Sequence, residues 1–238
     1  MNGDTIMQNP LGGSMRRRAL LAILVVLLLI GAYGAYVVSY PKYPEVKGCV
    51  NPFAVTKPVS KVQENWSEVH VFFKLVTTRD FWKLAKPWDV DYSHVKVVKH
   101  TIEYNGEKVT MLAMGIPLKD KKHVIALYEF SKPVQGVKIF GVEYAITGNI
   151  AKANAVYLNG KLKKLDSNSC SQECQSNSDC GFLGQCHWYC CKFDIIKAAE
   201  CCGICGDNIV CIATWCAFCI YESCYQWGSY CQGWTPGP

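Results

Sequence analysis

Recognisable catalytic motifs are missing from this chain of 238 residues. It has no nucleophile elbow, no Gly-rich phosphate loop and no zinc-protease helix. Histidine is scarce, with five copies, and four of them are scattered through segments that are typical of strands. The sequence therefore gives no basis for these enzyme classes, and we expect a protein that is not an enzyme.

Cysteine is nearly absent from the first 169 residues, where only Cys49 occurs, and abundant after them. A region below about 70–80 residues rarely folds on a hydrophobic core alone, so disulfides or metals usually stabilise it. We expect disulfides in this region. The expected disulfide cysteines are Cys170, Cys174, Cys180, Cys186, Cys190, Cys191, Cys201, Cys202, Cys205, Cys211, Cys216, Cys219, Cys224 and Cys231.

Two pairs of adjacent cysteines, Cys190-Cys191 and Cys201-Cys202, constrain the pairing. Neighbouring α-carbons lie about 3.8 Å apart, below the roughly 4.4 Å at which ordinary disulfides begin. Each member should therefore bond to a different distant partner, which predicts a branched network. The stretch CSQECQSNSDCGFLGQCHWYCC, residues 170–191, resembles small secreted cystine-knot and toxin-like modules.

Cys49 stands apart, because the fourteen later cysteines are an even number that can pair among themselves. An odd thiol in an exported chain is a candidate for an intermolecular disulfide. We therefore expect Cys49 to link two copies or a partner. The alternative is that Cys49 pairs with a cysteine of the C-terminal region.

Thiolate metal binding is the alternative to disulfides. Cys202 and Cys205 form one C-x-x-C pair and Cys216 and Cys219 another, enough for tetrahedral zinc. Cys211, Cys216 and Cys219 also match a C-x4-C-x2-C iron-sulfur spacing, with Cys224 or Cys231 as the fourth ligand. Regular spacings arise by coincidence where cysteines are this dense. We therefore favour disulfides without a cofactor over zinc or an iron-sulfur cluster.

Long apolar runs are absent except at the N-terminus, where residues 19–38 contain no charge. This length spans a bilayer, and Arg16, Arg17 and Arg18 before it favour a cytoplasmic N-terminal tail, residues 1–18. We expect a single-pass anchor in the cell membrane with the bulk of the chain extracytoplasmic. The alternative is a cleaved signal peptide, which would have a shorter apolar run.

The charge of the exported part is uneven. Residues 39–169 carry nineteen lysines and one arginine against twelve acids, whereas residues 170–238 carry two lysines against six acids. The lysines alternate with apolar residues along expected strands, as on a solvated sheet face, so we expect no nucleic-acid partner. We expect the basic and acidic regions to make electrostatic contact with each other, or with the opposite region of a neighbouring copy.

Three regions are expected after the anchor. Residues 39–58 contain four prolines and are expected to form a stalk, residues 59–166 a β-sandwich, and residues 167–238 a cysteine-rich module with short helices. Residues 147–165, TGNIAKANAVYLNGKLKKL, resemble the closing strands of immunoglobulin-like extracellular modules, which implies an Ig-like sandwich. The expected strands cover residues 69–76, 95–104, 109–116, 123–130, 137–140, 143–147 and 155–158.

Local signals refine these regions. Asn105-Gly106 and Asn159-Gly160 favour tight hairpins, because both residue types tolerate positive φ. Residues 194–200 are expected to form two helical turns, and the uncharged residues 209–221 a core helix held by cystines.

Two surface features add functional alternatives. Phe81, Trp82 and Trp88 are expected to cover an open end of the sandwich, with a ligand platform as the alternative. Asn65-Trp66-Ser67 is an N-glycosylation sequon, which makes Asn65 a candidate glycan site in an exported chain.

The sequence as a whole predicts a membrane-anchored extracytoplasmic protein that acts through binding or assembly, with protein partners or other copies of itself. One alternative is an accessory or electron-transfer subunit of a membrane oxidoreductase, with a thiolate-bound metal or iron-sulfur centre. The other is a structural component of an envelope or filament.

Overall fold

A computed structural model describes residues 20–30, 48–78, 81–165, 170–182 and 184–233, and it contains two compact units, Met1–Lys42 and Tyr43–Pro238. In the first unit, residues 20–30 form a helix with exposed side chains. Among the described residues, no helix combines the length and the apolarity that crossing a bilayer requires. The other residues of the segment 19–38 lie outside the described part, so the membrane anchor stays a prediction.

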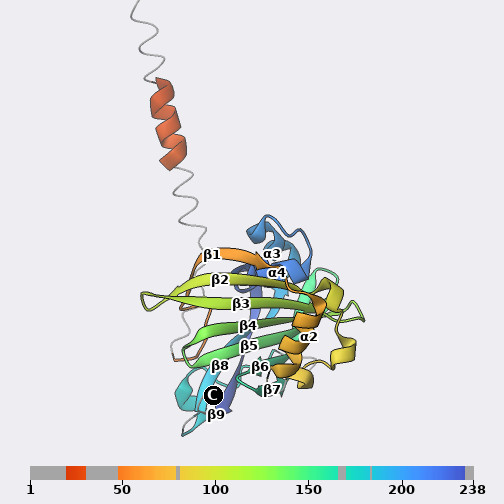
Figure 1. The fold of residues 1–238 in the computed structure, drawn as a ribbon. Coiled ribbons are helices and arrows are strands. Elements are labelled where there is room, and N and C mark those ends of the chain that lie inside the picture. The colour runs from red at the N-terminus through yellow and green to blue at the C-terminus, as the bar shows by residue number, and fades with distance from the viewer. Residues whose placement is uncertain (1–19, 31–47, 79–80, 166–169, 183, 234–238) are drawn as a thin grey trace, which may run out of the picture. The chain divides into compact units, whose positions relative to one another are not determined.

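The second unit is mainly β-structure, as the sequence predicts. Its described strands form one nine-stranded antiparallel sheet in the order β1-β2-β3-β4-β5-β6-β8-β9, and β7 pairs with β6 (Figure 1). From β1 to β6, neighbours in the sheet follow one another in the chain, whereas an immunoglobulin-like sandwich uses Greek-key connections. The strands are β1 Lys57–Glu64, β2 Lys96–Tyr104, β3 Glu107–Pro117, β4 His123–Val134, β5 Val137–Thr147, β6 Ile150–Leu158, β7 Lys161–Lys164, β8 Gly184–Asp194 and β9 Cys224–Gly233.

Short helices connect and cover these strands. The α-helices of this unit are α2 Glu68–Thr77, α3 Ile195–Cys202, α4 Ile209–Trp215 and α5 Ala217–Glu222. The 3₁₀ helices are η1 Phe81–Lys83, η2 Pro87–Asp89, η3 Tyr92–His94 and η4 Asn177–Cys180. The helix expected over residues 194–200 is confirmed as α3. The core helix expected over 209–221 is present as two helices that meet at Cys216.

Helix α2 corrects the prediction of a strand over residues 69–76. The alternating Val and Phe residues favour a strand by propensity, but Ser67 caps a helix by accepting a hydrogen bond from the His70 backbone N–H at 3.2 Å. Val71 and Leu75, four positions apart, are then buried against the sheet. Burial of this helical face outweighs the strand propensity.

Both faces of the central sheet are covered. Val71, Leu75 and Phe81 pack on one face, against β4 side chains such as Ile125 and Leu127. The opposite face, which carries Ala126 and Tyr128, packs against β8, α4 and α5. Because β4 is buried on both sides, its sequence is apolar over consecutive residues instead of alternating.

The β8–β9 ribbon joins the sheet to the cysteine-rich region. It pairs with β6 only at Ile150–Lys152, and Tyr189, Phe193 and Tyr230 then pack in the same core as β3–β6. Phe193 contacts Tyr144 of β5 edge to face, with ring centroids 5.1 Å apart. Two layers of β-structure thus share a core, as in a sandwich. The expected regions 59–166 and 167–238 lie in one compact unit with one sheet.

The expected stalk is described only from Gly48 onward, and this part is packed into the unit. Phe53 is 1% exposed and lies in an aromatic cage. Its ring stacks on Tyr221 at 4.1 Å and meets Tyr128 and Phe218 edge to face at 4.8 and 5.2 Å. Proline density suggested an extended linker, but residues 52–54 form a turn that places the Phe53 ring in the core.

The two expected hairpin turns are confirmed. Asn105 and Gly106 have φ values of 51° and 79° between β2 and β3, and Asn159 has a φ of 45° between β6 and β7. Positive φ at both central residues is the backbone of a type I′ turn, which matches the twist of the strands.

Candidate functional site

A branched disulfide network holds the C-terminal part of the compact unit together. The adjacent cysteines bond to different partners, as the sequence predicts: Cys190 to Cys224 and Cys191 to Cys170. The adjacent cysteines Cys201 and Cys202 also bond to different partners. The further disulfides that do not share a sulfur are Cys180–Cys231, Cys201–Cys219, Cys202–Cys216 and Cys205–Cys211.

The four expected zinc ligands are divided between two places. The sulfurs of Cys202, Cys205 and Cys216 lie within 4.8 Å of one another. Cys219 instead groups with Cys201 and the Glu222 carboxylate. The Cys201–Cys219 disulfide joins α3 to α5, and Cys202–Cys216 joins α3 to the junction of α4 and α5. Cys205–Cys211 joins the loop after α3 to α4.

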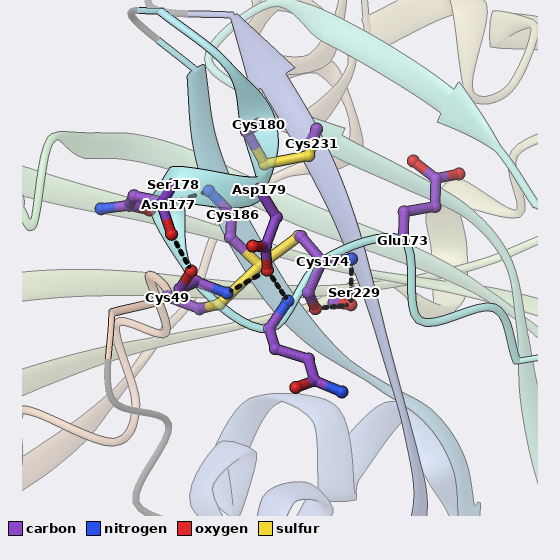
Figure 2. The surroundings of a disulfide bond; sticks show 12 residues. Cys49, Glu173, Cys174, Asn177, Ser178, Asp179, Cys180, Cys186, Ser229 and Cys231 are labelled. Carbon is purple, nitrogen blue, oxygen red and sulfur yellow. Dashed lines mark hydrogen bonds between the residues drawn. A yellow bond between two sulfur atoms is a disulfide. The ribbon is translucent and has the colours of Figure 1, made fainter.

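Three cysteines, Cys49, Cys174 and Cys186, form a further cluster, which we call the cysteine triad, and the Cys180–Cys231 disulfide packs against it on the side of Cys174 (Figure 2). Their sulfurs lie within 4.8 Å of one another, and the Cys186 sulfur faces both of the others. The Cys186 α-carbon is 4.7 Å from that of Cys49 and 5.9 Å from that of Cys174. The structure thus surrounds Cys49 with C-terminal cysteines and buries it to 7% exposure.

Backbone hydrogen bonds bring these three segments together. The Val50 N–H donates to the Cys186 carbonyl at 2.7 Å, and the Trp188 N–H donates back to the Val50 carbonyl at 3.0 Å. On the other side, the Ser229 hydroxyl donates to the Cys174 carbonyl at 2.6 Å. A two-strand pairing and a side-chain hydrogen bond therefore fix where the sulfurs meet.

The loop that carries Cys174 has its own stabilising contacts. The Asp179 carboxylate accepts hydrogen bonds from the backbone N–H groups of Gln175 and Ser176, which hold the pKa of Asp179 below its usual value. Asn177 accepts a hydrogen bond from the Cys186 N–H at 2.9 Å. These contacts close the loop against β8 (Figure 2).

His187 follows the triad residue Cys186 in β8 and is a packing residue. It is 4% exposed and stacks on Tyr230 with ring centroids 5.7 Å apart. Burial lowers the pKa of His187 to about 4, because the apolar surroundings disfavour the charged ring. The ring is therefore neutral at pH 7.

The aromatic residues of the loop after α2 divide into one buried and two exposed side chains. Phe81 is 2% exposed and packs against the sheet, whereas Trp82 and Trp88, which were expected to cover an open end of the sandwich with it, are 56% and 66% exposed. Lys83 and Lys86 place their ammonium groups 5.9 and 5.6 Å from the centroids of these two indoles.

Helix α2 adds further exposed apolar side chains beside the loop. Val69 and Phe73 are 64% and 59% exposed, and α2 contacts η1 and η2. We call the exposed side chains of α2, η1 and η2 the aromatic surface; its large apolar members are Val69, Phe73, Trp82 and Trp88. Exposed aromatic and apolar side chains that lie close together are typical of an interaction site.

A cleft of about 530 Å³ lies on another part of the unit and contains His94 and His123. Asp91 and Ser93 both contact the same nitrogen of His94, at 2.9 and 3.0 Å. A catalytic triad needs the carboxylate and the nucleophile on opposite ring nitrogens. These residues therefore form a local turn contact and not a Ser-His-Asp relay.

Two other polar residues, Asn65 and His100, have simple environments. Asn65 is exposed just before α2, and its sequon partner Ser67 is the helix cap. His100 is buried, with Nε2 2.6 Å from the Thr214 carbonyl oxygen, and burial lowers its pKa.

Comparison with known proteins gives no assignment: no protein-family model, no curated protein and no solved structure matches the chain. Function therefore has to be argued from the sites themselves. The sequence predicted a C-terminal partner for Cys49 only as the alternative, and it did not identify Cys174 and Cys186, because Cys49 is far from both in the chain. The one available signal was the odd number of cysteines.

Proposed function

We propose that this chain is a membrane-anchored extracytoplasmic protein that acts by assembly with other copies of itself. Residues 19–38 would supply the anchor and Arg16–Arg18 the orientation. The dense disulfide network supports an oxidising compartment, because such bonds are rare in reducing cytosol.

The aromatic surface carries this proposal. Four large apolar side chains on α2, η1 and η2 are more than half exposed: Val69, Phe73, Trp82 and Trp88. Aromatic residues are enriched in protein interfaces, where burial of a few large rings supplies much of the binding energy. Asn65 is exposed three residues before α2, so a glycan at this sequon would border the aromatic surface.

Charge favours a second copy as the occupant. The region 39–169, which contains the aromatic surface, has twenty basic residues against twelve acids. The helices α3 to α5, residues 195–222, carry Glu200, Asp207 and Glu222 against the single Lys197. We call these three acids the acidic surface. A basic surface that meets an acidic one on the next copy makes a head-to-tail contact, which forms rings or filaments.

Self-association of the full-length protein in detergent tests the proposal. We expect a reversible, salt-sensitive increase in mass with concentration by sedimentation equilibrium. Lys83→Glu with Lys86→Glu should weaken it about tenfold or more, because like charges then face each other. Adding Glu200→Lys and Asp207→Lys to the same chain should restore it. Phe182→Ser, which alters a side chain that is 97% exposed outside the aromatic surface, is the matched control.

A monomer at every concentration would contradict self-assembly. So would association that the charge reversal leaves unchanged, or a reversal that the compensating pair does not rescue. In those cases the aromatic surface would serve a different partner or none.

The grouping of Cys202, Cys205 and Cys216 favours a second candidate function. Three thiolates at this separation suit zinc or an iron-sulfur centre, which would make the chain an accessory or electron-transfer subunit of a membrane oxidoreductase. Metal analysis and the visible spectrum of natively isolated protein test this alternative. Absence of stoichiometric metal, together with an intact mass that indicates seven disulfides, would exclude it.

A further inference from the structure

Counting bonds shows that the cysteine triad contains the odd thiol of the chain. Six disulfides use twelve of the fifteen cysteines and leave Cys49, Cys174 and Cys186. A sulfur in a disulfide bonds to one other sulfur only. A seventh disulfide within the triad therefore leaves one triad sulfur as a thiol.

The same backbone accommodates two versions of this seventh disulfide. The α-carbon separations of 4.7 Å for Cys49–Cys186 and 5.9 Å for Cys174–Cys186 both fall in the usual range of about 4.4–6.8 Å. Cys186 is the shared sulfur of both pairings (Figure 2). Neither pairing requires a segment to move first.

Noncovalent contacts keep the segments in place whichever disulfide is present. Val50 hydrogen bonds to the Cys186 carbonyl, Ser229 holds the backbone of Cys174, and Asn177 accepts from the Cys186 N–H. The unpaired sulfur therefore stays beside the bond that it can attack. Such proximity gives an intramolecular reaction a very high effective concentration.

We propose that the triad is an intramolecular thiol–disulfide exchange site with Cys186 as the shared sulfur. The Cys49 thiolate attacks the Cys186 sulfur, the Cys174–Cys186 bond breaks, and Cys174 leaves as the thiolate. The reverse reaction restores the first state. One disulfide forms as one breaks, so the step needs no oxidant or reductant.

Exchange decides which segment is tied covalently to β8. The Cys49–Cys186 bond joins residues 137 positions apart and anchors the start of the compact unit, whereas Cys174–Cys186 closes a loop with a separation of 12. All three cysteines are buried, at 7%, 3% and 0% exposure, so a neighbouring sulfur is a more accessible reactant than a thiol in solution. This inference does not rest on the proposed self-assembly.

Disulfide mapping of the full-length wild-type protein tests the proposal. The protein is quenched in acid, alkylated with N-ethylmaleimide and digested with pepsin in acid, because exchange requires the thiolate. We expect one alkylated thiol per chain, divided between Cys49 and Cys174, with both Cys186 disulfides present. The ratio should shift reversibly when the protein is warmed and cooled before the quench.

Three cysteine variants test whether the exchange is confined to the triad. Cys49→Ser and Cys174→Ser should each lock the remaining pair and remove the free thiol. Cys191→Ser, which exposes the Cys170 thiol outside the triad, should leave the ratio unchanged.

Three outcomes would overturn the proposal. The first is a thiol at one fixed cysteine in every molecule, whether free or linked to another chain. The second is a ratio that does not respond to temperature, and the third is a native mass that shows zinc bound with all three triad cysteines reduced.

Discussion

Replacing Phe53 by alanine tests whether the segment before β1 belongs to the core. Phe53 is 1% exposed and contacts four aromatic rings, those of Tyr128, Phe140, Phe218 and Tyr221. Truncating a buried Phe removes its burial energy and leaves a cavity, which costs about 3–5 kcal/mol. For a unit of this size we expect the melting temperature to fall by about 6–20 °C.

The assay is denaturant unfolding of the full-length protein with its disulfides intact, followed by tryptophan fluorescence. Val55→Ala is the matched control, because Val55 lies two residues further on and is 39% exposed. We expect the control to change the free energy of unfolding by no more than about 0.5 kcal/mol. A Phe53→Ala variant as stable as this control would refute the packing argument and would favour the original prediction of an exposed stalk.

Three further predictions concern other parts of the unit. Gly228→Ala should lower the free energy of unfolding by about 1–3 kcal/mol, because the new Cβ would lie 2.4 Å from the Tyr189 ring, whereas Gly233→Ala meets open space and should be neutral. Gly106→Ala should cost about 1–2 kcal/mol in the same assay, because φ is +79° there. The His187 pKa of about 4 lies below the unfolded value of 6.5, so protonation favours unfolding and stability should fall by about 3 kcal/mol as the pH drops from about 6.5 to about 4. His187→Phe should remove this loss, and equal pH dependence in both proteins would contradict the assignment.

The sequence predicted those features that depend on neighbouring residues. The turn at Asn105-Gly106, the helix after Asp194 and the separate partners of Cys190 and Cys191 all follow from local backbone geometry. The mainly β fold follows from the density of Val, Ile and Tyr residues in short segments. Each of these predictions needed no knowledge of what lies across the core.

Features that depend on distant contacts were not predictable in the same way. Helix α2 has strand-like composition, and its helical form depends on burial of Val71 and Leu75 against the sheet. Phe53 looked like a stalk residue because its cage comes from β4, β5 and α5. The partners of Cys49 were hidden for the same reason, since β8 lies much later in the chain.

The cage around Phe53 also bears on the order in which the chain can fold. Phe53 stands near the start of the compact unit, and its closest ring contact, Tyr221, is among the last residues of that unit to be synthesised. Contacts this distant in sequence slow folding, because a long loop must close before they form. The native core is therefore completed only after nearly the whole chain has left the ribosome. Until then the unpaired cysteines of the chain can form non-native disulfides.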